Sequence, residues 1–178
     1  ILHAKGIYDV RVTHVAGELT DHYDPSKKVV NLSDSVYGST SVSAVGVAAH
    51  ECGHVIQHAR GYVPITIRTA LVPIVNFASR LSMPLILIGL ILGYVGLAKI
   101  GVVLFCGVLI FQLVTLPVEF DASARAMRVL DSLGILYGEE IKGARKVLTA
   151  AALTYVAAVV STALQVFRLV LLINNRRD

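Results

Sequence analysis

The chain has 178 residues, of which 55% are hydrophobic and 16% charged, and its mean hydropathy is +0.70. This composition excludes an ordinary soluble domain and favours a membrane protein in contact with a lipid bilayer. The net charge of +4 is small, and the Lys and Arg residues are spread out without interleaved aromatic residues, so the sequence predicts no nucleic-acid partner.

The N-terminal part of the chain predicts a small β element. Within residues 7–16, Val10, Val12 and His14 alternate with Asp9, Arg11 and Thr13. This period of two is typical of a half-buried strand. Residues 17–28 are rich in turn residues, and residues 29–33 predict a second short strand.

Residues 48–58 read Ala-Ala-His-Glu-Cys-Gly-His-Val-Ile-Gln-His and predict a helix. Ser41 and Ser43 are candidate N-caps, and Gly61 is a candidate C-cap. This predicted helix precedes the apolar half of the chain and contains most of the candidate catalytic and metal-binding residues.

Within this helix, His50 and His54 lie one turn apart on the same face, and Glu51 lies about 100° round from His50. This pattern points to a hydrolytic zinc site. Two imidazoles hold the ion, a third protein ligand comes from elsewhere, and Glu51 takes a proton from the bound water. In zinc peptidases a short strand commonly runs beside such a helix and pairs with the substrate, a role that we expect for residues 29–33.

Three apolar runs follow the motif. Residues 82–98 and 101–117 are each just long enough to cross a membrane and predict a helical hairpin that turns at Lys99-Ile100. A third run covers residues 147–173. Residues 65–81 predict an amphipathic stretch at the membrane interface.

These elements predict a mainly α membrane protein, with a zincin-like HExxH helix and a small β element mounted on about three transmembrane helices. Residues 1–178 are expected to form a single unit. In that unit, residues 1–81 and 118–146 make up a water-facing catalytic layer.

The third metal ligand cannot be a downstream histidine, because all six histidines lie at or before position 58. A hairpin would return the chain at Pro117 to the side that carries the motif, and Glu119 follows at the start of a predicted helix. An acid so close to the bilayer is costly unless it is paired or metal-bound, although an acid at a helix N-terminus can also stabilise the helix dipole. Asp121 is the alternative ligand, or an outer acceptor for an imidazole N–H or a partner for Arg125.

Three stretches carry a resemblance to a known family: residues 17–25 (Gly-Glu-Leu-Thr-Asp-His-Tyr-Asp-Pro), 47–54 and 116–123. Over almost the whole chain they resemble the YugP-like family of bacterial membrane zinc metallopeptidases. That family usually has a further N-terminal span, so we expect a segment to precede Ile1.

More distantly, His50, His54 and Glu119 are similar to the ligand set of HtpX-like and CAAX prenyl peptidases. In those peptidases a second acid commonly follows the ligand Glu by four residues, whereas this chain has Ser123 at that position. The resemblance implies a membrane-embedded endopeptidase in a bacterial cell membrane and a gluzincin-like site.

The sequence therefore predicts a zinc-dependent endopeptidase that binds one Zn²⁺ per chain, uses Glu51 as general base and acid, and cleaves polypeptides, with membrane proteins among the candidate substrates. The candidate oxyanion donors are His22, Tyr23, Tyr37 and Arg125. Twelve of the sixteen Lys and Arg residues lie in the water-facing layer, which favours an active site on the cytoplasmic face.

Two other classes of function fit part of the pattern. A metal transporter or sensor is expected to place ligating residues inside its spans, but the predicted spans hold no His, Asp or Glu. A catalytically inactive membrane scaffold would not need Glu51, because structural zinc requires no general base.

Overall fold

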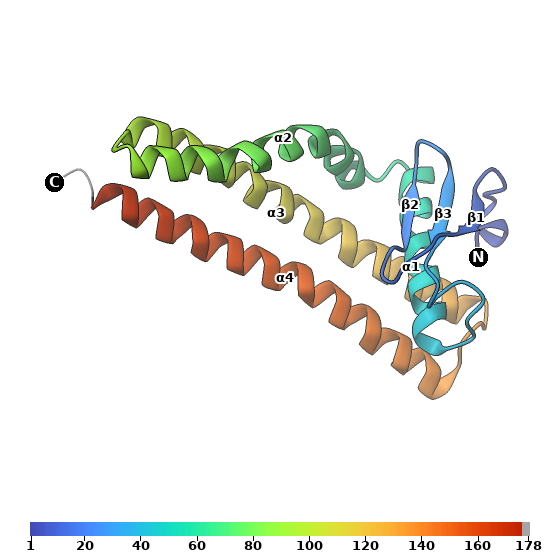
Figure 1. The fold of residues 1–178 in the computed structure, drawn as a ribbon. Helices are drawn as coiled ribbons and strands as arrows, with labels where there is room; N and C mark the ends of the chain where they lie inside the picture. The colour runs from blue at the N-terminus through green and yellow to red at the C-terminus, as the bar shows by residue number, and fades with distance from the viewer. Residues whose placement is uncertain (176–178) are drawn as a thin grey trace. The chain divides into compact units, whose positions relative to one another are not determined.

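The computed structural model describes residues 1–175, which are mainly helical (Figure 1). In chain order the elements are η1 (His3–Lys5), β1 (Arg11–His14), β2 (His22–Asp24), β3 (Val29–Leu32), α1 (Val42–Ala59), α2 (Val63–Ile91), α3 (Val95–Ser132) and α4 (Gly138–Asn174). The chain divides into two compact units. The first contains Ile1–Ile65 and Pro117–Leu153, and the second contains Thr66–Leu116 and the chain from Thr154 on.

The small sheet of the first unit has the strand order β1-β3-β2, with β3 parallel to β1 and antiparallel to β2. The strand predicted at residues 7–16 is shorter than expected, and β2 lies in a segment for which the sequence predicted only turns. Because β1 and β2 occupy both edges of β3, the expectation that residues 29–33 pair with a substrate is wrong.

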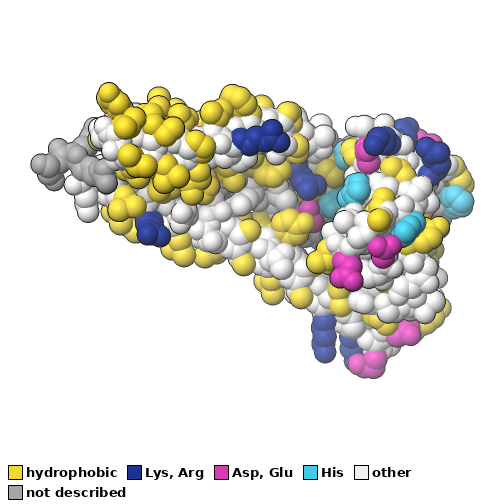
Figure 2. Space-filling view, viewed as in Figure 1, with side chains coloured by type: hydrophobic (Ala, Val, Ile, Leu, Met, Phe, Trp, Pro, Cys, Tyr) yellow, Lys and Arg dark blue, Asp and Glu magenta, His cyan; other side chains and the backbone are white. Residues whose placement is uncertain are grey.

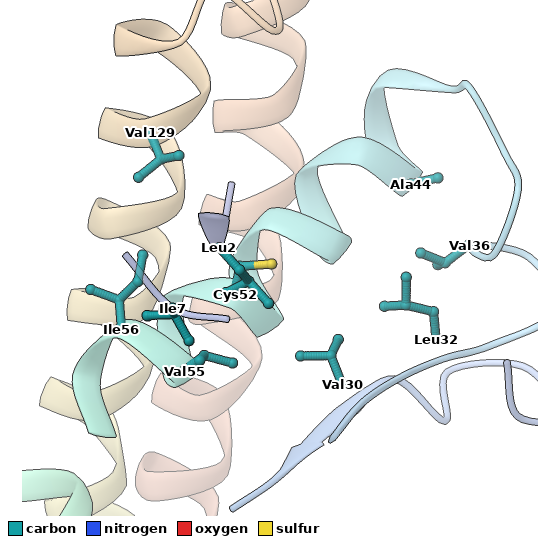
Figure 3. Packing of buried hydrophobic residues seen from close by; sticks show 10 residues of the cluster. All are labelled: Leu2, Ile7, Val30, Leu32, Val36, Ala44, Cys52, Val55, Ile56 and Val129. Carbon is teal, nitrogen blue, oxygen red and sulfur yellow. The ribbon is translucent and has the colours of Figure 1, made fainter. Parts of the chain in front are cut away.

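The sheet packs against α1 through the apolar side chains of β3. Val30 of β3 and Val55 of α1 are each 1% exposed. Figure 3 shows that this core combines residues that flank η1 with residues of β3, the loop after it, α1 and α3. Its buried members are Leu2, Ile7, Val30, Leu32, Val36, Ala44, Cys52, Val55, Ile56 and Val129.

Helix α1 begins and ends close to where the sequence predicts. The Ser41 hydroxyl caps its N-terminus by accepting a hydrogen bond from the Ala44 N–H at 3.2 Å, an interaction that typically contributes about 1 kcal/mol. After the helix, Gly61 adopts a left-handed conformation with a φ of 62°, which a residue with a side chain rarely adopts. The prediction of Ser41 as N-cap is therefore confirmed, whereas the C-cap is Arg60 and Gly61 is the left-handed residue directly after it.

In the second unit, α2 and α3 form a hairpin whose turn lies at residues 92–94, where Gly93 has a φ of 74°. The predicted turn at Lys99-Ile100 is therefore wrong. The reason is the close packing of the two helices: a Cβ at Gly89 would lie 2.5 Å from the backbone N of Ala98, so Ala98 belongs to the second helix of the pair. Buried residues of α4 pack on the same hairpin in a cluster of Ile86, Ala98, Val102, Leu169 and Ile173.

Among the described residues, three helices are long and apolar enough to cross a membrane: α2, α3 and α4. The segment 65–81 belongs to α2 and does not form a separate interfacial helix, and α3 continues through Pro117 without a break. Up to residue 175 the second unit contains no Asp, Glu or His, and Figure 2 shows mainly hydrophobic side chains on its visible face. The prediction of about three transmembrane helices is confirmed.

Candidate metal centre

Helices α1 and α3 approach each other closely at Gly53, which lies inside the HExxH motif. A Cβ at Gly53 would lie 2.5 Å from the carbonyl oxygen of Ala122, a distance too short for any residue but glycine. Ala49 and Ala122 beside this crossing are 1% and 0% exposed. These small residues allow the two backbones to come together, and the side chains one turn away on each helix can therefore meet.

The residues that meet there are His50 and His54 of α1 and Glu119 of α3. The Glu119 Oε2 atom lies 3.2 Å from His50 Nε2 and 3.7 Å from His54 Nε2. A tetrahedral zinc with bonds of about 2.0–2.1 Å holds its ligand atoms about 3.3 Å apart. The two distances to the carboxylate are close to this value, and the three ligand atoms lie within 4.8 Å of one another, so this group could hold a metal ion.

The proton position on His54 follows from the hydrogen bonds of Gln57, a fully buried residue one turn further along α1. The amide nitrogen of Gln57 donates to the Val118 carbonyl at 2.8 Å and to Asp121 Oδ2 at 2.9 Å. Its oxygen therefore faces His54 Nδ1 at 3.0 Å and accepts a hydrogen bond from it. With the proton on Nδ1, the Nε2 atom of neutral His54 keeps a free electron pair for a metal.

Ser123 has the corresponding position beside His50. Its Oγ lies 3.1 Å from His50 Nδ1, so it can accept the N–H of an imidazole whose Nε2 faces Glu119. This is the residue that replaces the second acid of the more distant peptidases. A hydroxyl thus stands where those peptidases commonly have a carboxylate, and it contacts the first histidine of the motif.

The cluster contains buried carboxylates, which favour a bound cation and can accept a proton. Glu119 is 2% exposed and Glu51 is 7% exposed. Burial raises the pKa of Glu51, although the neighbouring imidazoles of His54 and His50 act in the opposite direction. Burial lowers the pKa of His54, but the Glu119 carboxylate, with smaller contributions from Glu51 and Gln57, outweighs this effect and the net shift is upward. The field of Glu119 therefore favours positive charge at the imidazole nitrogens.

The structure gives Asp121 a different environment from Glu119. Its Oδ2 atom accepts hydrogen bonds from Arg125 Nε at 2.5 Å and from the Gln57 amide at 2.9 Å. The guanidinium of Arg125 lies over the ring of Tyr62, with 5.5 Å between its central carbon and the ring centroid. Asp121 is thus a partner for Arg125, as one of the sequence alternatives proposed, and Gln57 connects it to His54.

The remaining oxyanion candidates contact other residues. His22 lies 3.0 Å from the Asn31 amide on the sheet, and the ring of Tyr23 packs edge-on against His58 at 5.5 Å. Tyr37 packs against a histidine of β1. Among the described residues, the hydrogen bonds and ring contacts of these three side chains all involve residues outside the metal cluster.

Sequence comparison relates the chain to zinc peptidases. Residues 1–174 match the sequence profile of a family described as "Putative neutral zinc metallopeptidase". The chain is also 47% identical over its full length to the "Putative membrane protease YugP" of Bacillus subtilis (strain 168), of which it covers 79%. No solved structure matches the chain significantly.

Proposed function

We propose that this chain, which belongs to that zinc metallopeptidase family, is a membrane-bound endopeptidase with one zinc ion held by His50, His54 and Glu119. The observation that carries the proposal is the set of hydrogen bonds around Gln57, from which the tautomer of His54 follows. Because Gln57 uses its amide N–H groups on other acceptors, the Nε2 atom of His54 is left as an electron-pair donor within 3.7 Å of the Glu119 carboxylate.

A zinc ion bound there would supply a Lewis acid that polarises the peptide carbonyl and acidifies water. Glu51 lies next to His50 in the chain and is buried at the same site. Its carboxylate, made more basic by burial, takes the proton of the attacking water and later gives it to the departing amine. The two hydrogen-bonded Nδ1 atoms keep the imidazoles in fixed orientations during the reaction.

The polypeptide substrate is proposed from the family and from the named relative, which is described as a membrane protease. Membrane proteins are among the candidate substrates because α2, α3 and α4 are each long and apolar enough to cross a bilayer. The excess of Lys and Arg in residues 1–81 and 118–146 supports an active site on the cytoplasmic face of a bacterial membrane.

The test is the substitution Glu51→Gln, which keeps the shape of the side chain but removes its ability to accept a proton. Loss of a general base typically reduces the rate by about 10²- to 10⁴-fold. We expect that loss in the hydrolysis of a casein-type substrate, with bound zinc unchanged in elemental analysis.

The matched control is Glu18→Gln, the same change at an exposed position of the N-terminal segment. It should retain the activity of the unmodified protein. If Glu51→Gln hydrolyses the substrate as fast as this control, Glu51 is not the general base.

A further inference from the structure

A second concave site lies in the first unit, beside the C-terminal end of α1 and the last turns of α3. It is a pocket of about 390 Å³ lined by Lys5, Ile56, Arg60, Arg125, Arg128 and Val129. Four of these six residues are cationic, two are aliphatic and none is acidic. We propose that this pocket binds the phosphate group of an anionic ligand, either free phosphate or the headgroup of an anionic phospholipid.

The two arginines from α3 are held in place before any ligand arrives. The Nε of Arg125 donates to Asp121 at 2.5 Å, and the Nε of Arg128 donates to the Ala124 carbonyl at 3.2 Å. Both hydrogen bonds leave the terminal nitrogens of the guanidinium groups available, and among the described residues these nitrogens have no hydrogen-bond acceptor. An arginine fixed in this way loses little entropy when it binds an oxyanion.

The other two cations lack a counterion. Among residues 1–175, neither Lys5 nor Arg60 forms an ion pair. Within residues 1–175, the acid that forms an ion pair with one of the four cations is Asp121, which offsets the charge of Arg125. Positive charges gathered in one pocket repel each other, and an anion bound between them relieves that repulsion.

The chemistry of the pocket favours phosphate over a single carboxylate. Planar guanidinium groups bind phosphate oxygens through paired N–H donors, and an ammonium group such as that of Lys5 adds a compact charge. Ile56 and Val129 give the pocket apolar walls that partly exclude water and so strengthen these interactions.

This proposal does not depend on the peptidase activity. Its residues are outside the group of possible metal ligands, and phosphate binding can be measured on protein with or without zinc. A failure of the Glu51 experiment would leave this site untouched, and a failure to bind phosphate would leave the metal centre untouched.

The experiment is calorimetric titration of the full chain in a neutral detergent with inorganic phosphate, at constant ionic strength maintained with chloride. We expect saturable binding that Lys5→Gln and Arg60→Gln each weaken by about five-fold or more. Arg11→Gln is the matched control, because it removes an equal charge from an exposed position on β1, outside the pocket. It should change the dissociation constant by less than two-fold.

A second pair of measurements separates the two sources of phosphate. The protein is placed in nanodiscs of phosphatidylcholine alone or with phosphatidylglycerol, and the phosphate titration is repeated. If an anionic headgroup fills the pocket, inorganic phosphate will bind only in the phosphatidylcholine discs. If free phosphate is the ligand, it will bind equally in both.

Two results would overturn the proposal. One is the absence of saturable phosphate binding in every medium. The other is an equal loss in Arg11→Gln and in the pocket variants, which would indicate unspecific attraction to a basic protein. Thermal unfolding without phosphate identifies any variant that fails to fold, and in that case Arg128→Gln replaces it, because that side chain is exposed and forms no ion pair within residues 1–175.

Discussion

The close approach of α1 and α3 can be tested by adding a single methyl group at Gly53. In Gly53→Ala the new Cβ would lie 2.5 Å from the carbonyl oxygen of Ala122, and 3.1 Å and 3.2 Å from its C and Cα atoms. All three atoms belong to the backbone of α3, so no side-chain rotation relieves the overlap. The helices must separate by about 0.9 Å to restore an ordinary contact of 3.4 Å.

The effect on stability combines two opposing contributions. Overpacking of a tight contact typically costs about 1–3 kcal/mol. Replacing glycine by alanine inside a helix contributes about 1 kcal/mol in the opposite direction. The net destabilisation is therefore about 0–2 kcal/mol, which thermal unfolding in detergent can measure.

The effect on the metal is larger than the effect on the fold. Glu119 lies one turn before Ala122, so a separation of the helices carries its carboxylate away from His50 and His54. A zinc site tolerates about 0.2 Å of change in its bond lengths. We therefore expect the zinc affinity of Gly53→Ala to fall by about ten-fold or more, as measured by competition with a chromogenic chelator.

The same substitution at Gly46 is the control. A Cβ at Gly46 in the same helix would meet Ala144 at 3.7 Å, an ordinary contact. Gly46→Ala should gain about 0.5–1 kcal/mol from helix propensity and retain its zinc affinity. If Gly53→Ala behaves like Gly46→Ala in both measurements, the helices do not cross as the structure describes.

Two further predictions concern the metal ligands and the membrane. Glu119→Ala should lose its zinc in dialysis against a mild chelator. Asp121→Ala should weaken zinc binding by only about 10- to 100-fold, because Asp121 acts on His54 through Gln57. If Asp121→Ala loses the zinc and Glu119→Ala retains it, Asp121 is the ligand. On a background without the two native cysteines, Tyr94→Cys in the turn after α2 should react with an impermeant maleimide on intact cells, and Tyr8→Cys should react only after permeabilisation. Both tyrosines are largely exposed, at 65% and 74%. Labelling of both positions from one side would rule out the membrane hairpin, and labelling of Tyr8→Cys alone on intact cells would reverse the proposed sidedness.

The sequence was sufficient to predict those features that depend on local pattern. The spacing of His50 and His54, the cap at Ser41 and the number of apolar helices all follow from residues close together in the chain. The selection of Glu119 relied on one further argument, that a carboxylate near the bilayer needs a partner, and the structure brings this residue to the two histidines.

Other features depend on packing between distant segments, which composition does not encode. The apolar runs are nearly continuous, so hydropathy could not distinguish a turn at Gly93 from one at Lys99, whereas the contact of Gly89 with Ala98 does. Strand β2 has only three residues, and pairing with β3 determines its conformation more than its own propensity does.

The hydrogen-bond acceptors of the two histidines were also missed. Gln57 could have been suspected, because it follows His54 by three residues and thus lies on the same face of α1. Ser123 lies 73 residues from His50, and only the crossing of α1 and α3 makes them neighbours. The one available signal was its spacing of four residues after Glu119, where the more distant peptidases commonly have an acid.

The nature of these two acceptors affects how strongly a metal at this site would polarise water. Hydrogen bonding of an imidazole N–H to a carboxylate raises the basicity of the ligand. Here both N–H groups face neutral oxygens, and the nearest carboxylate beyond His54, that of Asp121, is separated from it by the Gln57 amide and balanced by Arg125. Imidazoles with neutral acceptors donate less charge to a bound cation, so more of its positive charge remains to act on water. Burial also raises the pKa of Glu51, so under the proposed mechanism the same site would favour both the loss of the proton from water and its capture.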